Sequence, residues 1–281
     1  MKIAISAETT IDMPKELLEK YNIHTVPFNI LLGEDDRQDG ELKSAEIFEY
    51  VQKTGVLPKT SAINEFTYTE YFKGLLNEYD AIVHISLSSG ISCACQNAKA
   101  AAAGLQNIYI VDSQSLSTGI ALLAIYASKL AAKGNIAAAE IANLVAGRVK
   151  DVQASFVIER LDYLHKGGRC SSLALFGANL LKIRPQIIVK DGKMGSAKKY
   201  KGNMDIVVKN YCADVLEQFN TPDLSIAFIT YTTATEGMVA NAKEALINRG
   251  FKEVYETQAG ATIASHCGEH TLGILYINDA K

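Results

Sequence analysis

A run of seven residues, 81–87, is almost entirely apolar and predicts a buried strand. The polar segment 88–92 follows it, and the Ala-rich stretch 93–103 then predicts a helix. A strand that passes through a short polar loop into a helix is the building unit of a parallel sheet covered by helices. This unit constrains the fold more than any other segment of the chain.

The same alternation extends over the first 150 residues. Apolar segments predict further strands at residues 2–6, 24–32 and 107–111, and helices are expected after Asp12 and at residues 44–54, 67–76, 117–133 and 136–150. Asp12 is expected to cap the first helix, and residues 34–40 and 58–61 are expected as loops. We predict an α/β domain over residues 1–155, whose parallel sheet carries helices on both faces.

The pattern changes after residue 155. Two apolar segments around Asp191-Gly192 predict a β-hairpin with a tight turn. Helices are then expected at residues 203–219 and 235–249, and strands at 224–231, 251–256 and 271–278. We therefore predict a second, mixed α+β domain over residues 156–281.

Composition narrows the classes of function. The 281 residues are 48% apolar and carry a net charge of −3, which allows a large core and gives no support to nucleic-acid binding. The odd number of five cysteines, without framework spacing, favours free thiols and a cytoplasmic location. No apolar run approaches the roughly 20 residues of a membrane span. The phosphate-loop motif of common ATP sites is also missing from the sequence.

The polar loop 88–92 contains three serines and one glycine. Amide groups in the first turn of a helix, together with the helix dipole, attract anions, and serine hydroxyls add further donors. Helix capping by Ser89 or Ser92 explains the same residues. Both interpretations stay open, although three serines are more than one cap needs.

A second polar cluster, His266-Cys267-Gly268-Glu269-His270, lies near the end of the chain. Its side chains are of types that bind metals, but Gly268 and the strand expected after it argue against a helix and against a metal site. The competing enzyme hypothesis is a Cys/His hydrolase with Cys267 or Cys93 as nucleophile beside His266, or a metal-dependent hydrolase that uses His266, Cys267 and His270. The simpler interpretation is that these thiols are small buried residues.

Three further segments are candidates for binding. Arg169 follows a flexible Gly167-Gly168 pair, and an arginine there suits a carboxylate or a phosphate. Residues 173–181 are nearly all apolar and predict a buried helix or the wall of a tunnel. Lysines cluster on or beside the expected hairpin, as a solvated face or as a docking patch for an acidic partner or an anionic membrane: Lys190, Lys193, Lys198, Lys199 and Lys201.

Several segments together resemble the DegV family of bacterial fatty-acid-binding proteins. The most specific match is at residues 161–169, LDYLHKGGR, which is similar to the pattern L-x-Y-L-x-x-G-G-R. Thr60-Ser61 is similar to the start of T-S-Q-P, residues 88–96 to S-S-x-x-S-G-T-Y-Q, and residues 266–268 to the start of H-x-G-P. Residues 5–14 and 111–119 are similar to two further family motifs, so the resemblance spans nearly the whole chain.

The resemblance implies two α/β domains with a long-chain fatty acid between them, no catalytic residues and no cofactor besides the bound lipid. It implies that Thr60, helped by Ser61, holds the carboxylate together with Ser92 and His266. Some family members are the fatty-acid-binding subunit of a two-component fatty acid kinase. The resemblance therefore also implies a separate ATP-dependent kinase as partner, with Arg169 facing it.

The chain departs from the family pattern close to the expected head-group site. Ala7-Glu8 stands in place of T-D, Ala62-Ile63 in place of Q-P, Cys93-Ala94-Cys95 in place of G-T-Y, and Glu269-His270 in place of P-G.

Overall fold

The computed structural model describes residues 1–170 and 183–279. Its strands are β1 (Ile3–Glu8), β2 (Ile23–Val26), β3 (Asn29–Leu32), β4 (Asp35–Gln38), β5 (Lys59–Ser61), β6 (Ala81–Ser86), β7 (Ile108–Asp112), β8 (Val152–Val157), β9 (Arg184–Lys190), β10 (Lys193–Tyr200), β11 (Ile226–Tyr231), β12 (Glu253–Gln258) and β13 (Leu272–Ile277). Its helices are α1 (Lys15–Lys20), α2 (Ser44–Thr54), α3 (Glu65–Leu76), α4 (Ala94–Ala103), α5 (Thr118–Ala131), α6 (Ala138–Arg148), α7 (Asp162–Lys166), α8 (Met204–Gln218), α9 (Glu236–Arg249) and α10 (Ala261–Cys267). Two short 3₁₀ turns, η1 (Thr9–Ile11) and η2 (Val149–Asp151), complete the described elements.

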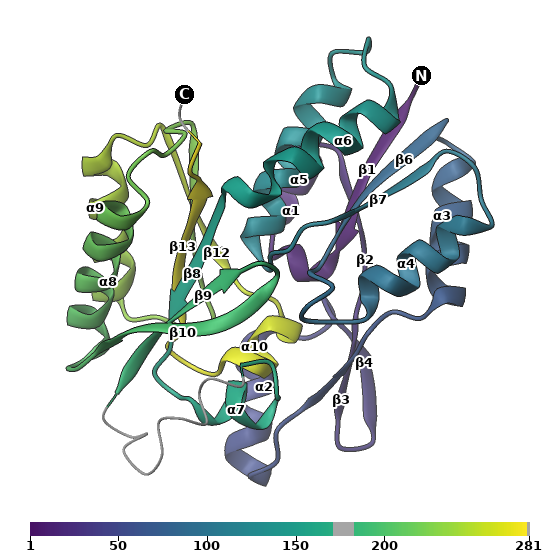
Figure 1. Ribbon diagram of the computed structural model, residues 1–281. Coiled ribbons are helices and arrows are strands. Elements are labelled where there is room, and N and C mark those ends of the chain that lie inside the picture. Colours follow the sequence, from purple (N-terminus) through teal and green to yellow (C-terminus); the bar gives the residue numbers. More distant parts are fainter. Residues whose placement is uncertain (171–182, 280–281) are drawn as a thin grey trace.

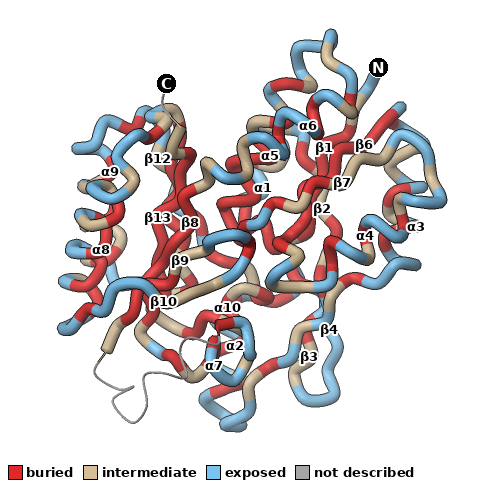
Figure 2. Tube along the Cα trace, in the orientation of Figure 1, coloured by how far each residue is buried: buried red, intermediate tan, exposed pale blue. Residues whose placement is uncertain are grey.

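Two large sheets stand side by side (Figure 1). One is parallel, with the strand order β2-β1-β6-β7, and the other is mixed, with the order β10-β9-β8-β13-β11-β12. A small antiparallel sheet, β4-β3-β5, extends below the parallel one. The fold is the expected α/β architecture, and the described core is concentrated in the strands and in the helix faces against them (Figure 2).

Helices cover both faces of the parallel sheet, as predicted. Helices α3 and α4 lie on one face, and α5 and α6 lie on the other (Figure 1). The outer face of the mixed sheet is covered by α8 and α9. Helix α5 contacts β1 and β6 in one sheet and β8, β11 and β13 in the other, so it lies between them. Its sequence is apolar almost all round, which is what burial on several sides requires.

The expected hairpin is confirmed, and its turn geometry follows from its residues. Strands β9 and β10 pair antiparallel, with Lys190 opposite Lys193. Asp191 and Gly192 both have positive φ, 50° and 75°, as a type I′ turn requires. The boundary proposed at residue 155 falls inside β8, because the mixed sheet begins at Val152. The division into two domains stays a prediction.

Two segments expected as loops are strands instead. Residues 34–40 contain β4, which pairs with β3 after a turn at Gly33, and residues 58–61 contain β5, which pairs with the other edge of β3. Their acidic and Pro-containing sequences have low strand propensity, but pairing with β3 overrides it. The apolar segment 173–181, expected as a buried helix or a tunnel wall, lies outside the described residues.

Two local expectations about helix ends are also wrong. Asp12 does not cap α1, whose N-cap is Pro14; instead Asp12 has a φ of 51° and its carboxylate faces α5 and α10. Residues 261–267 form α10, where the sequence predicted no helix around His266. Gly268 ends that helix with a φ of 76°, so it marks a boundary without preventing the helix. In the described part of the chain, no helix has the length and hydropathy needed to cross a membrane.

Candidate functional site

The parallel sheet places a crevice where its strand order reverses. The chain moves from β1 to β2 on one side and from β6 to β7 on the other, so the connections that leave the carboxyl ends of β1 and β6 run in opposite directions. Such a switch point is where open parallel sheets bind ligands. A cavity of about 460 Å³ lies there, beside the loop that follows β6. A larger depression of about 860 Å³ between β7 and α6 is an open surface groove.

The cavity has a polar cluster in a largely apolar lining. Six of the side chains that line it carry a hydroxyl, a guanidinium or an imidazole: Thr60, Ser89, Ser92, Arg169, Thr262 and His266. Much of the remaining lining is apolar, and includes Phe28, Leu87, Leu116, Leu164, Met194 and Ile263. The residues come from both halves of the chain, with β10 and α10 contributing opposite the loop after β6. The cavity is therefore complete only when the two sheets are in place.

Thr60 and His266 form the centre of the polar cluster. Thr60 Oγ1 lies 2.7 Å from His266 Nε2, and the two residues belong to β5 and α10. Because side chains alternate along a strand, the neighbouring Ser61 points the other way; it is exposed and is not part of the cavity lining. The structure thus places Thr60, but not Ser61, beside His266.

The glycine pair before Arg169 explains how the histidine fits. A methyl group at Gly167 would lie 2.9 Å from His266 Nδ1, so the absent side chain makes room for the ring. Arg169 turns back toward the pair, and its guanidinium donates to the Gly167 carbonyl oxygen at 2.6 Å. Burial, and next the positive charge of Arg169, lower the pKa of His266 to about 4. The imidazole is therefore neutral near pH 7, with one nitrogen that donates and one that accepts.

Ser92 is the serine of the loop whose hydroxyl is available to a ligand. Its Oγ accepts from the Ala94 amide at 3.2 Å. No acceptor for its own hydroxyl proton is found among the described residues, so that proton can be donated into the cavity that Ser92 lines. The structure thus places Ser92, Thr60 and His266 on one cavity, with Arg169 at its exposed side.

The other two serines have structural roles. Ser88 donates to the Gly192 carbonyl oxygen at 2.6 Å, and Ser89 donates to Asp112 at 2.5 Å. The amide of Ser89 also donates to Asp112, and the next three amides all donate to Ser88. The amides of residues 89–92 therefore already have partners within the protein, and the expectation that amides in the first turn of the following helix attract an anion stays a prediction.

The tip of the β9–β10 hairpin closes over this loop. A methyl group at Gly90 would lie 2.4 Å from the Gly192 carbonyl oxygen, so only glycine permits the observed approach. Ser88 adds the hydrogen bond described above, and Met194, two residues beyond the turn, lines the cavity. The predicted hairpin is thus a roof of the site, a role that the sequence pattern did not indicate.

A buried polar network lies beneath the loop, and of its members only Glu8 stands out in the sequence, as a departure from the family pattern. The Glu8 carboxylate accepts from Ser86 Oγ at 2.6 Å, Tyr68 OH at 2.7 Å and the Leu87 amide at 2.8 Å, and lies 3.2 Å from His84 Nε2. Burial alone would raise the pKa of Glu8, but His84 and these hydrogen bonds hold it below its usual value. The sequence signal for this network was an acidic residue inside an apolar strand, since a buried carboxylate needs hydrogen-bond or charged partners.

Two carboxylates anchor the helix that carries His266. Asp12 accepts from the Gly260 amide at 2.7 Å, and Asp39 accepts from the Ala261 amide at 3.0 Å, so both bind the start of α10. Ser117 Oγ also donates to Asp12, at 2.5 Å. Burial, with a smaller contribution from Asp39, raises the pKa of Asp12 well above its usual value. These contacts join the first part of the chain to α10.

The residues of the hydrolase hypothesis have separate environments. Burial raises the pKa of Cys267 to about 12, which is the opposite of what a nucleophilic thiolate needs. His270 lies beyond the end of α10 and pairs with Glu159. Within residues 1–170 and 183–279, no group of three or more potential metal ligands converges. Cys93 is exposed and lines the cavity next to Ser92.

Comparisons of sequence give one family over the whole chain. The family model described as "Uncharacterised protein, DegV family" matches residues 2–279. Protein DegV of Bacillus subtilis is 29% identical over 280 residues, which cover 98% of this chain and 99% of that protein. A protein of Thermotoga maritima named fatty acid-binding protein is 28% identical over 286 residues, covering 97% and 96% of the two chains.

Comparisons with solved structures agree with the sequence comparisons. The crystal structure of DegV from Bacillus subtilis, described as a fatty acid binding protein, has a TM-score of 0.86 and 27% identity, and the match covers 99% of this chain and 100% of that one. A fatty-acid-binding DegV family protein from Thermus thermophilus has a TM-score of 0.89, and at 24% identity it supports the fold alone; the match covers 99% and 100% of the two chains. The chain belongs to the DegV family.

Proposed function

We propose that this protein binds a long-chain fatty acid, with the carboxylate at Thr60, Ser92 and His266 and the acyl chain along the apolar lining of the cavity. The observation that carries the proposal is the polar cluster in an otherwise largely apolar cavity of about 460 Å³. That volume lies within the range of small-molecule sites, roughly 300–1,000 Å³. Relatives named as fatty-acid-binding proteins support the same ligand.

The acyl chain supplies most of the affinity in this scheme. Each buried methylene contributes about 0.8 kcal/mol, so a long chain outweighs the costs of association and ordering. A ligand as small as phosphate would leave the apolar lining in contact with water. The lining therefore favours a lipid over a small anion.

The polar cluster fixes the orientation of the ligand. Ser92 has a hydroxyl proton to donate, and the neutral His266 ring can donate through one nitrogen while Thr60 completes the set. Arg169 adds positive charge at the exposed side of the cavity. Hydroxyls and a neutral ring hold a carboxylate without a buried ion pair, so the group stays available for reaction.

Extraction of the purified protein tests the ligand. The protein is denatured, extracted with organic solvent, and the extract is analysed by quantitative mass spectrometry. We expect a long-chain fatty acid in a stoichiometric amount, and weaker retention of it by Ser92→Ala protein but not by Ser61→Ala protein. A protein that neither contains nor takes up any fatty acid contradicts the proposal.

We propose further that the protein is a non-catalytic subunit that presents the carboxylate to a separate ATP-dependent kinase. A carboxylate oxygen would attack the γ-phosphorus of ATP, forming the acyl phosphate while the bond to the β-phosphate oxygen breaks and ADP leaves. The partner supplies nucleotide and metal. Arg169 is exposed next to the carboxylate site, which suits a contact with the partner. Arg169→Ala protein should retain lipid but support less acyl phosphate formation; normal phosphorylation would contradict this role.

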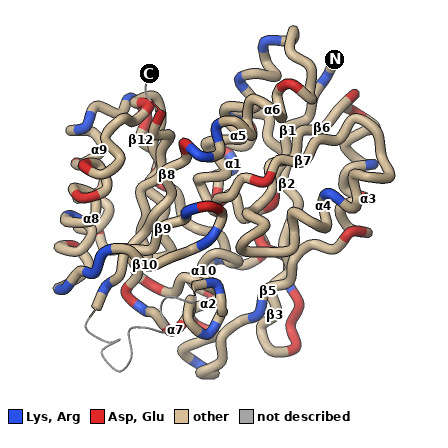
Figure 3. The backbone as a smooth tube through the Cα atoms, viewed as in Figure 1, with Lys and Arg blue, Asp and Glu red and all other residues tan. Residues whose placement is uncertain are grey.

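The hairpin is the segment we propose for a transient contact with anionic membranes. Lysine and arginine residues lie along β9 and β10 (Figure 3). One of them, Lys198, is paired with Asp214 at 2.7 Å. Surface lysines attract anionic lipid, and the attraction weakens with salt. Binding to vesicles should therefore require anionic lipid and decrease at high ionic strength. Binding that is independent of lipid charge would exclude this contact.

A further inference from the structure

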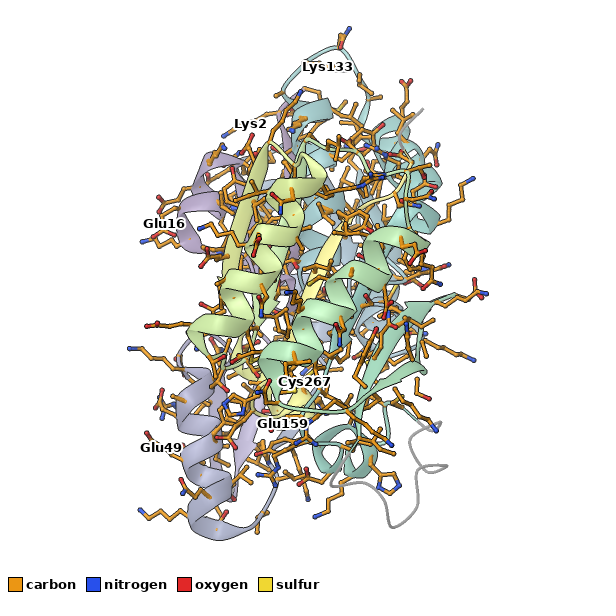
Figure 4. The ribbon with its side chains drawn as sticks, turned by 90° about the vertical axis from the view of Figure 1, so that its left-hand side faces the viewer. Lys2, Glu16, Glu49, Lys133, Glu159 and Cys267 are labelled. Carbon is orange, nitrogen blue, oxygen red and sulfur yellow. The ribbon has the colours of Figure 1, made fainter. Side chains whose placement is uncertain are left out.

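Helix α10 presents one of its faces to the cavity. The residues of this helix that line the cavity are Thr262, Ile263, His266 and Cys267, a spacing that places them on one side of a helix. Cys267 ends the helix and lies in the lower half of the molecule as drawn in Figure 4. Thr262 and His266 are four residues apart, so they are neighbours along this face. Thr262 therefore lies beside the polar cluster that contains His266.

The hydroxyl of Thr262 is buried and lacks a hydrogen-bond partner within residues 1–170 and 183–279. The residue as a whole is only 4% exposed. A threonine in a helix commonly donates its hydroxyl to a carbonyl three or four residues earlier. The carbonyl three residues earlier, that of Ala259, already accepts from Ser44 Oγ at 2.5 Å. A buried hydroxyl without a partner costs free energy, so its presence needs an explanation.

A second hydroxyl of the same helix provides a comparison. Ser265 is also buried, but it does not line the cavity, and its Oγ donates to the Ala261 carbonyl oxygen at 2.7 Å. The hydroxyl that lacks a partner is thus the one whose side chain lines the cavity. This difference indicates that the partner of Thr262 is a ligand.

We propose that Thr262 is a further ligand-binding residue, whose hydroxyl donates to the carboxylate of the bound fatty acid. The inference rests on the proposed function and adds a residue to its head-group site. The hydroxyl and the methyl group of threonine are similar in size, so rotation about χ1 turns Oγ1 toward a ligand with little change in shape.

The number of donors at the site leaves room for this contact. An ionised carboxylate has about four positions that accept hydrogen bonds. Thr60 Oγ1 and His266 Nε2 share one proton across their 2.7 Å contact, so with a neutral ring the pair has one proton left to donate. Ser92 supplies a second proton. Thr262 would supply a third, from the same helix face as His266.

The missing partner predicts opposite effects on stability and on affinity. Thr262→Val keeps the shape of the side chain and removes only the hydroxyl. In the lipid-free protein this hydroxyl makes no hydrogen bond, so the midpoint of thermal unfolding should stay the same or rise. In the complex the change removes a hydrogen bond to a charged group, so the Kd for the fatty acid should increase by roughly 10- to 100-fold.

The test measures both quantities on the same proteins. Thermal unfolding of the lipid-free proteins and titration calorimetry compare the wild type with Thr262→Val, Thr262→Ser and Ser265→Ala. Thr262→Ser retains the hydroxyl and should keep most of the affinity. Ser265→Ala removes a buried hydroxyl of the same helix that lies away from the cavity lining, so it is the matched control and should bind like the wild type.

The calorimetry uses a series of saturated straight-chain acids of different lengths. Because every acid in the series carries the same carboxylate, the loss of affinity in Thr262→Val should be the same factor at each chain length. A loss that changes with chain length overturns the assignment to the carboxylate, and an equal loss in Ser265→Ala overturns it as well.

Two other results contradict the role of Thr262. Equal affinity of Thr262→Val and wild type overturns the contact. A Thr262→Val protein that fails to fold, or that unfolds at a lower temperature without lipid, also overturns it, because the hydroxyl would then stabilise the protein in the absence of ligand. A wild-type protein that binds none of the acids overturns the proposed function and this inference with it, so the two failures are distinguishable.

Discussion

His266 gives the lipid-free protein a dependence of stability on pH that the geometry of the site explains. Its pKa is about 4 in the folded protein, because the ring is buried and Arg169 is close, against an ordinary value of 6.5. Between those two values the unfolded chain binds a proton that the folded protein excludes. Acidification through this range therefore favours unfolding, and the contribution of His266 to the free energy of unfolding is complete only above pH 6.5.

The size of the effect follows from the difference between the two pKa values. They differ by about 2.5, and about 1.36 kcal/mol per pKa unit gives roughly 3 kcal/mol as an upper limit. His266→Gln keeps a polar side chain beside Thr60 but removes the titration. Urea unfolding of lipid-free wild type and variant, measured from about pH 7 to pH 4, yields both free energies of unfolding. The wild type should lose up to roughly 3 kcal/mol more than the variant over that range.

Two further variants test whether the pH dependence of stability comes from His266. His165 is an exposed histidine in α7, so His165→Gln should follow the wild-type curve. Arg169→Ala removes the second cause of the low pKa of His266, so its curve should lie between those of the wild type and His266→Gln. Parallel curves for wild type and His266→Gln would refute the assignment of a buried neutral ring.

Three other predictions concern the loop, the anchor of α10 and the roof of the cavity. Ser92→Ala should weaken fatty-acid affinity by roughly 10- to 100-fold in titration calorimetry, as expected for a hydrogen bond to a charged group, whereas Ser61→Ala should bind normally. Asp12→Asn keeps an acceptor for the Gly260 amide and removes a carboxyl group whose raised pKa costs stability as pH rises above 3.8; urea unfolding at pH 7 should show a larger free energy of unfolding for the variant, and a smaller one would contradict the raised pKa of Asp12. Gly90→Ala places a methyl group 2.4 Å from the Gly192 carbonyl oxygen, so hydrogen exchange at the hairpin tip should accelerate; unchanged protection would show that the tip does not contact the loop.

Much of the fold could be predicted because its signals are local. The apolar run that ends before the serine loop forms β6, and Asp191-Gly192 adopts the turn that its residues favour. Strands β4 and β5 could not be predicted from their own residues, since they exist through pairing with β3. Their stability depends on contacts between segments that are distant in the sequence.

The site, like the fold, has features that the sequence predicts and others that depend on contacts between distant segments. Family motifs pointed to Thr60, Ser92 and His266, and the structure brings them onto one cavity. Whether Thr60 or Ser61 faces the cavity depends on the register of β5, and a sequence motif does not give that register. The partners of Glu8 come from α3 and β6, so its burial could not be deduced from β1 alone.

Helix α5 has a consequence for how quickly a ligand can enter and leave. Because it packs against both sheets and is apolar almost all round, pulling the sheets apart would expose a large hydrophobic surface. The two halves are therefore poorly suited to open like a hinge. Exchange should instead proceed by local movement of small segments such as the hairpin tip, whose contact with the loop is one hydrogen bond and one close glycine approach. The residence time of a ligand would then be set by the opening rate of a few residues and would be largely independent of the global stability of the protein.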